Sequence, residues 1–246
     1  MAYELALKKS GISRKWIYQK FLMLGSGGIG KSTFWSFDER AGYIEAEAGL
    51  NFLDVYKNPV RSWGEIGQLL MALTKLKEEG NFPYTTLVVD TIDRILYYID
   101  ESVMEWAKTK YKNGSSYSAI GDIPEGAGWS ERTRRINKFL EIIESFPCAV
   151  ALVGHLENKE IKEDTGEKYN KYTINIGGKS GASLCHWSDH TLLIQSKMVG
   201  DQLRRTVYTK PTKSREAKSR GNIIKDGWVW SDNDEENFKK LREQFD

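Results

Sequence analysis

Residues 25–32 read Gly-Ser-Gly-Gly-Ile-Gly-Lys-Ser and fit the pattern G-x-x-x-x-G-K-[ST]. In such a segment the glycines let the backbone curl so that successive N–H groups point at phosphate oxygens. Lys31 would reach the β- and γ-phosphates, and the Ser32 hydroxyl would ligate Mg²⁺. The segment therefore predicts a loop that binds ATP together with Mg²⁺. The residues expected to contact the nucleotide are Gly25, Ser26, Gly27, Gly28, Ile29, Gly30, Lys31, Ser32 and Thr33.

The flanking sequence separates this interpretation from a glycine-rich turn that matches by chance. The apolar run 16–24 predicts a strand that leads into the loop, and residues 31–38 predict a helix behind it. A strand before the loop and a helix after it are the context that a phosphate loop needs, because the helix N-terminus favours anions.

A phosphate loop also needs a carboxylate that holds magnesium at the end of a buried strand. The run 85–90, Thr-Thr-Leu-Val-Val-Asp, is continuously apolar before Asp90, as expected of a central strand covered on both faces. Asp90 is therefore the predicted second magnesium residue beside Ser32. The alternative is that Asp90 only caps the helix that follows.

Hydrolysis requires a group that positions or deprotonates water near the γ-phosphate. Glu45 and Glu47 stand at the end of the strand predicted over 42–49, and strand alternation would place both on one face. Spacing alone does not choose between them, and solvated surface acids are the alternative. His155 ends the apolar run 148–155 and is a candidate phosphate sensor, although a lone histidine is as often structural.

The wider pattern indicates the elements that would position these residues. Predicted helices over 62–80, 92–111 and 130–146 alternate with the short apolar strands, and further strands follow after residue 188. This succession predicts an α/β fold, a mainly parallel central sheet flanked by helices with antiparallel strands at the C-terminal end. We expect one domain over 1–246, with an N-terminal tail over 1–14 and a helical C-terminal tail over 231–246. Residues 111–129 and 157–187 lack periodicity and are predicted as long loops.

Composition limits the class of protein. Thirty-six basic residues against 34 acidic ones exclude a strongly basic protein that coats nucleic acid, so any such surface must be local. Cys148 and Cys185 match no metal spacing and are predicted to be free thiols. No segment approaches the length of a membrane span, and we expect a cytoplasmic protein without membrane contact.

Taken together, these motifs resemble the ATPase core of RecA-type recombinases. The closest resemblance is to the compact phage RecA-like single-strand annealing proteins, the fourth Sak-type family, over about residues 15–230. The segment 43–54 resembles the strand whose last glutamate activates water, which assigns that role to Glu47 and not Glu45. The segment 153–160 resembles the strand that ends in a phosphate-sensing residue, here His155. The implied catalytic set is Glu47, Lys31 and His155, in the host cytoplasm if the chain is phage-encoded.

The same resemblance places two DNA-binding loops at 111–129 and 157–187. Interleaved basic and aromatic residues suit single-stranded DNA, since bases stack on rings and lysines contact phosphates. The alternative is that the rings pack against the body and the lysines are only solvated. The candidates are Lys112, Tyr117, Trp129, Lys179 and Trp187.

The basic run 209–220 falls where relatives carry residues that reach a neighbouring subunit's ATP. The candidates for this trans-acting role are Lys210, Lys213, Arg215, Lys218 and Arg220; a solvated hairpin and a DNA-binding patch are the alternatives. The resemblance thus implies a DNA-dependent ATPase that assembles with itself as a ring or filament on single-stranded DNA and promotes annealing or strand pairing. A single-strand-binding protein is a further expected partner. A helicase loader or packaging accessory that acts through protein contacts is the second hypothesis, and a small-molecule kinase is a weaker third.

Overall fold

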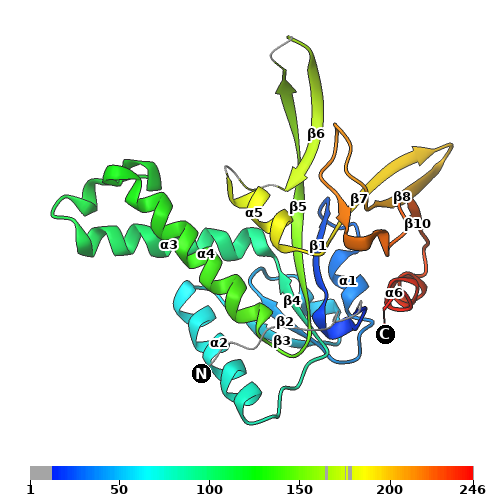
Figure 1. Cartoon of the computed structure of the whole chain (residues 1–246), viewed down its shortest axis with the longest axis horizontal. Helices are drawn as coiled ribbons and strands as arrows, with labels where there is room; N and C mark the ends of the chain where they lie inside the picture. Colours follow the sequence, from blue (N-terminus) through cyan, green and yellow to red (C-terminus); the bar gives the residue numbers. More distant parts are fainter. Residues whose placement is uncertain (1–12, 164–165, 175, 177–178, 246) are drawn as a thin grey trace, which may run out of the picture.

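A mainly parallel sheet forms the centre of the molecule in the computed structural model, which describes residues 13–163, 166–174, 176 and 179–245. In spatial order its strands are β10 (Trp228–Trp230), β8 (Gln202–Tyr208), β7 (His190–Val199), β1 (Lys20–Gly25), β5 (Ala149–Lys162), β4 (Thr86–Asp90), β2 (Ala41–Glu45) and β3 (Tyr56–Pro59) (Figure 1). The strands from β7 to β3 are parallel, whereas β8 and β10 pair antiparallel at the C-terminal side. The predicted fold class is therefore confirmed.

Alternation along the central strands divides the apolar side chains between two cores. In β1, Leu22 and Leu24 belong to one buried cluster, whereas Phe21 and Met23 belong to the other. The first cluster is covered by α2 (Trp63–Glu78), α3 (Ile92–Lys110), α4 (Ala127–Glu144) and α5 (Lys179–Trp187). The second lies under α1 (Lys31–Trp35) and α6 (Asp234–Arg242). Because both faces of the sheet are covered, its strands read as continuous apolar runs.

Local signals locate α2 correctly. The Ser62 hydroxyl accepts a hydrogen bond from the Glu65 N–H at 3.2 Å, as expected of an N-cap. Ile66, Leu70 and Leu73 are buried on one stripe of the helix. Among the described residues, no helix combines the length and the apolar character that crossing a bilayer requires.

In the region predicted as an irregular loop over 157–187, most of the described residues instead belong to strands and a helix. Strand β5 does not end at His155 but continues to Lys162, and it pairs antiparallel with β6 (Lys168–Ile174). This β5–β6 hairpin projects away from the sheet (Figure 1), and α5 follows it. The prediction was wrong because a hairpin outside the core has no buried face, so its sequence lacks the apolar alternation that marks a strand.

The prediction of a long loop over 111–129 is also partly wrong. It contains 3₁₀ turns at Gly114–Ser116, Ile120–Asp122 and Pro124–Gly126, and α4 begins at Ala127. Ile120 and Ile123 are buried in the first cluster, and the segment packs against α3 and α4. The segment joins the outer ends of α3 and α4, which pack side by side and extend away from the sheet (Figure 1). We call this pair of helices and its connection the helical arm.

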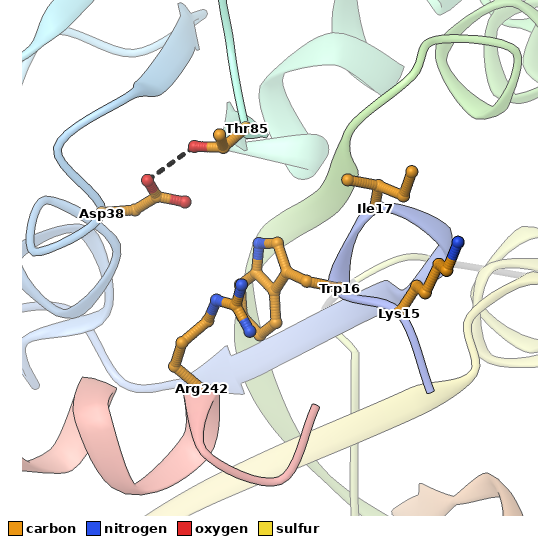
Figure 2. A pocket seen from close by; sticks show the side chains of 6 residues that line it. All are labelled: Lys15, Trp16, Ile17, Asp38, Thr85 and Arg242. Carbon is orange, nitrogen blue, oxygen red and sulfur yellow. Dashed lines mark hydrogen bonds between the residues drawn. The ribbon is translucent and has the colours of Figure 1, made fainter. Parts of the chain in front are cut away.

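Both ends of the described chain meet in the second cluster. The strand expected from residue 16 begins only at Lys20, because Trp16–Tyr18 form a 3₁₀ turn that buries Trp16. The Trp16 indole donates to Thr86 Oγ1 at 2.8 Å, and the Arg242 guanidinium lies 4.9 Å from its ring centre. Figure 2 shows Arg242 over Trp16, beside the Asp38–Thr85 hydrogen bond of 2.7 Å. The tail expected over 231–246 thus contributes a helix to the core; residues 1–12 of the expected N-terminal tail lie outside the described residues.

Phe238→Ala tests whether α6 is part of the core. Phe238 is 7% exposed and contacts the rings of Trp16, Phe34 and Trp35. Removing a buried phenyl ring leaves a cavity, so we expect the free energy of unfolding to fall by about 3–5 kcal/mol in urea titrations followed by tryptophan fluorescence. The control is Lys240→Ala on the exposed side of α6, expected to change stability by less than about 0.5 kcal/mol. Equal effects of the two changes would contradict a core role for α6.

Candidate active site

The glycine-rich segment forms a turn between β1 and α1. Gly25 ends β1, and α1 begins at Lys31. Gly28 and Gly30 have φ values of +70° and +100°, a left-handed conformation that side chains disfavour. A Cβ at Gly30 would also lie 3.2 Å from Arg205 Nη1. The turn therefore requires glycine at these positions, and its open concave side fits a group of phosphate size.

Lys31 lies inside this turn. Its side chain is almost fully buried, and Nζ donates to the carbonyls of Gly25 at 3.0 Å and Ser26 at 2.8 Å. Burial lowers the pKa of Lys31, opposed by the negative charges of Asp90, Asp93 and Glu47. The ammonium group is thus held next to the loop by two neutral carbonyl acceptors. A negatively charged phosphate oxygen is a stronger acceptor and can take their place.

Asp90 ends β4 next to the start of α1. Burial raises the pKa of the Asp90 carboxyl, and a hydrogen bond with Ser32 and the charge of Lys31 oppose this. Thr91, not Asp90, is the N-cap position of α3, so the helix-cap alternative for Asp90 was wrong. Within the described part of the chain, no three acidic, histidine or cysteine side chains cluster as a metal site. A magnesium ion would therefore be held by Ser32 and Asp90 with oxygens of the phosphates and water, the arrangement that Mg²⁺ commonly adopts.

The two glutamates that sequence could not separate have different surroundings. Strand β2 ends at Glu45, so alternation does not extend to Glu47 and the two side chains do not share a face as predicted. Glu45 is buried, its carbonyl accepts from Arg61 Nη1 at 2.7 Å, and its carboxylate lies 3.7 Å from Arg61 Nη2. Glu47 is exposed at the cavity beside the phosphate loop, where Thr91 Oγ1 donates to Glu47 Oε2 at 3.1 Å. Glu47 thus faces the site, whereas Glu45 holds Arg61.

His155 reaches the site from β5 and is paired there. In the parallel register of β1 and β5, His155 lies opposite Gly25. Asp93 Oδ2 accepts from the His155 N–H at 3.0 Å and lies 3.0 Å from His155 Nδ1. This hydrogen bond raises the pKa of His155; burial and the charge of Lys31 oppose it, and Glu47 adds to it. With Nδ1 engaged by Asp93, Nε2 is the ring nitrogen available to a ligand.

These side chains line one cavity of about 480 Å³. Its walls come from the loop after β1, the start of α1, the turn after β2, the end of β4 and His155 on β5. The lining residues include Gly27, Gly28, Gly30, Lys31, Ser32, Thr33, Glu47, Asp90, Thr91 and His155. A cation, backbone donors, two carboxylates and an imidazole around one concave surface can bind a polyphosphate and activate water beside it. We call this the phosphate cavity.

Two supporting residues were not found from sequence. Asp93 follows the magnesium candidate by three positions and holds His155. Arg205 on β8 donates from Nη1 to the Ile29 carbonyl of the phosphate loop at 3.1 Å and lies 3.6 Å from Asp234 of α6. No local motif marks Arg205, because its contact joins residues 176 positions apart.

The five predicted trans-acting cations lie elsewhere, and none lines the phosphate cavity. Lys213 pairs with Glu163 at 2.9 Å, Arg220 pairs with Asp189 at 2.9 Å, and the Arg215 guanidinium lies 3.7 Å from the Tyr208 ring centre. Lys218 donates to the carbonyls of Cys185 and His186. Lys210 is exposed, and its backbone N–H donates to Asp226 Oδ1 at 2.9 Å. A role on a neighbouring subunit stays a prediction.

The predicted DNA-binding residues are divided between the helical arm and α5. Lys112 and Tyr117 lie at the end of the helical arm, where Tyr117 packs against Tyr111 and the first cluster. Trp129 lies in the first turn of α4 and is 53% exposed. Trp187 ends α5, donates to Glu144 at 3.0 Å and packs against the first cluster. Lys179 begins α5, and its side chain lies outside the described residues. For Tyr117 and Trp187 the packing alternative is the one observed.

Asp93→Asn tests the pairing of His155. Without the carboxylate charge, we expect the pKa of His155 to fall, measured from imidazole NMR shifts against pH. In the native chain the folded-state pKa is raised above the ordinary 6.5, so the pair stabilises the fold below pH 6.5. This contribution is lost as the pH rises through the folded pKa. His190, whose pKa burial lowers to about 4, is the internal control and should not move; an unchanged His155 titration would contradict the pairing.

Comparisons with known proteins identify the family of this chain. Residues 17–221 match the profile of a family described as an AAA domain (AAA_24). No curated protein sequence matches the chain. Among solved structures, a KaiC-like protein from the hyperthermophilic archaeon Pyrococcus horikoshii OT3 aligns over 88% of this chain and 87% of its own, with 9% sequence identity and a TM-score of 0.48. The match over most of the chain shows that the protein belongs to the AAA domain family and has the core of a P-loop ATPase.

Proposed function

We propose that this protein hydrolyses ATP with Mg²⁺ and that its nucleotide state controls binding to single-stranded DNA, in annealing or strand pairing. The observation that carries the ATPase part is the convergence of Lys31, Asp90, Glu47 and His155 on the phosphate cavity. The DNA part rests on the resemblance to RecA-type and Sak-type proteins and remains the finer proposal.

Each side chain has a distinct part in the proposed reaction. The loop N–H groups and Lys31 bind the phosphates, and Ser32 with Asp90 would hold the magnesium ion, which supplies positive charge to the phosphate oxygens. Glu47 accepts a proton from the attacking water, whose oxygen bonds to the γ-phosphorus as the bond to the β–γ bridging oxygen breaks. ADP and phosphate are the products. Thr91 positions Glu47 through the hydrogen bond to Oε2.

His155 would transmit the state of the γ-phosphate. Nε2 of the protonated ring donates to an anion, and Asp93 favours this protonated form. His155 belongs to the same uninterrupted strand as the first half of the β5–β6 hairpin. A displacement at His155 would therefore be carried by β5 to the hairpin, which projects from the body (Figure 1). We propose this hairpin as the element through which ATP changes partner binding.

A nucleotide switch that binds a protein is the second candidate, and one observation favours it. The hairpin carries charges of both signs and several of them are paired, as in Lys168–Glu160 at 2.7 Å within the hairpin and Lys171–Glu216 at 2.8 Å with the segment after β8. A surface of paired charges releases few counterions from a phosphate backbone and suits a partner with mixed charge. This candidate includes a helicase loader or packaging accessory.

Glu47→Gln and Glu45→Gln separate the two glutamates. We expect Glu47→Gln to retain ATP binding but to slow hydrolysis by about 10²–10⁴-fold, because the amide cannot accept the water proton. Glu45→Gln keeps the carbonyl contact to Arg61 and should reduce turnover by less than about tenfold. Phosphate release under single-turnover conditions measures both. A larger loss for Glu45→Gln would reverse the assignment.

Filter binding of labelled single-stranded DNA tests the partner. We expect the chain to bind DNA more tightly with a non-hydrolysable ATP analogue than with ADP or no nucleotide. We expect Lys31→Ala to remove this difference, because the phosphates of the analogue lose the ammonium group that binds them. A salt titration separates phosphate contacts from other binding. Absence of nucleotide-dependent DNA binding in a chain that hydrolyses ATP would favour the protein-partner switch.

A further inference from the structure

A second cavity of about 560 Å³ adjoins the phosphate cavity. The two share Glu47, Ala48, Thr91 and His155 as wall residues, so they meet at the side chains proposed to act on the γ-phosphate. The second cavity is closed on its other sides by Arg61, Asp93, Arg94, Tyr97 and Tyr98, among others. It therefore brings two guanidinium groups near the end of the site where negative charge would develop.

Only one of these two arginines is free to move toward that charge. Arg61 is held by the carbonyls of Glu45 and Val60 and lies near the Glu45 carboxylate. Arg94 is exposed, and no carboxylate lies within ion-pair distance of it among the described residues. Its guanidinium lies 4.5 Å from the Tyr97 ring centre and 5.2 Å from that of Tyr98, with a long hydrogen bond of 3.4 Å to Tyr98 Oη.

The phosphate cavity itself is short of positive charge. Lys31 is its permanent cation, opposed by the carboxylates of Asp90 and Glu47. ATPases with this loop gain much of their rate from an arginine that neutralises charge on the transferred phosphoryl group. The five cations of the run 209–220 do not line either cavity. Arg94 lies in the first turn of α3, three residues beyond the N-cap Thr91. It lines the adjoining cavity and forms no ion pair with a described residue.

We propose that Arg94 acts in cis as this arginine and contacts the γ-phosphate of the nucleotide bound to its own chain. The aromatic shelf of Tyr97 and Tyr98 holds the guanidinium through ring stacking, which a planar group can leave at little cost because no ion pair is broken. In hydrolysis Arg94 donates hydrogen bonds to the γ-phosphate oxygens while Glu47 takes the proton of water and the β–γ bridging bond breaks. This inference rests on the proposed ATPase function.

The variants Arg94→Gln and Arg94→Lys, compared with the native chain, test whether Arg94 contacts the γ-phosphate during hydrolysis. We expect Arg94→Gln to slow single-turnover hydrolysis by at least ~100-fold while leaving the affinity for an ATP analogue within about threefold. Arg94→Lys should recover only part of the rate, because an ammonium cannot form the two-pronged contact. Calorimetry with ADP and aluminium fluoride, a mimic of the transferring phosphoryl group, should show lost affinity in Arg94→Gln. The matched control is Arg134→Gln on α4, which changes an exposed arginine paired with Glu131. Its hydrolysis rate and its affinity for ADP with aluminium fluoride should equal those of the native chain.

Mixing two inactive variants decides between cis and trans action. Lys31→Ala chains carry an intact Arg94 but lack the phosphate-binding lysine, and Arg94→Gln chains have the opposite defect. If Arg94 acts in cis, no mixture hydrolyses faster than the Arg94→Gln chain alone. Restored turnover in the mixture would show that Arg94 acts on a neighbour's nucleotide and would overturn the assignment.

Two results separate this inference from the proposed function. Native-like hydrolysis and ADP–aluminium fluoride binding by Arg94→Gln would overturn this inference alone. A native chain that neither binds nor hydrolyses ATP would overturn the proposed function with it.

Discussion

The parallel register of β1, β5 and β4 is the constraint on which the site depends. It places Gly25 opposite His155 and Asp90 opposite Val153, so the loop, the sensor candidate and the magnesium candidate lie at one edge of the sheet. A shift of one residue in either pairing would turn His155 or Asp90 toward the opposite face. The buried alternation of Leu and Val side chains between two cores resists such a shift. The chemistry at the edge is thus positioned by packing in the centre.

The phosphate loop is also held from behind by the C-terminal part of the chain. Arg205 joins the Ile29 carbonyl to Asp234, and the Trp230 indole donates to Asp234 at 2.6 Å. These contacts connect β8, β10 and α6 to the loop, so the antiparallel end of the sheet supports the site as well as the core. The aromatic cluster of Trp16, Phe34, Trp35 and Phe238 fixes α6 in this position. Stability and nucleotide binding therefore share residues on this side of the molecule.

Two projections extend from the central sheet of this chain (Figure 1). The helical arm and the β5–β6 hairpin leave the sheet in different directions (Figure 1). The hairpin continues the strand that carries His155, whereas α3, half of the arm, begins beside Thr91, Asp93 and Arg94. Each projection thus starts at a side chain that lines one of the two adjoining cavities. Under the proposed function, partner binding at either projection and nucleotide binding would influence one another through these connections.

The sequence by itself determined the phosphate loop, the buried strand ending at Asp90, α2 with its Ser62 cap and the α/β class, because these depend on local spacing and on periodic burial. It did not determine the β5–β6 hairpin, which has no buried face, or the turns within 111–129, which are fixed by Ile120 and Ile123 reaching the core. The choice of Glu47 over Glu45 rested on the resemblance; the structure separates them because β2 ends at Glu45 and Arg61 holds that residue. Only the tertiary structure decided three further features: the pairing of His155 with Asp93, the contact of Arg205 with the phosphate loop, and the free guanidinium of Arg94. Each depends on which groups the fold brings within hydrogen-bond distance of the side chain.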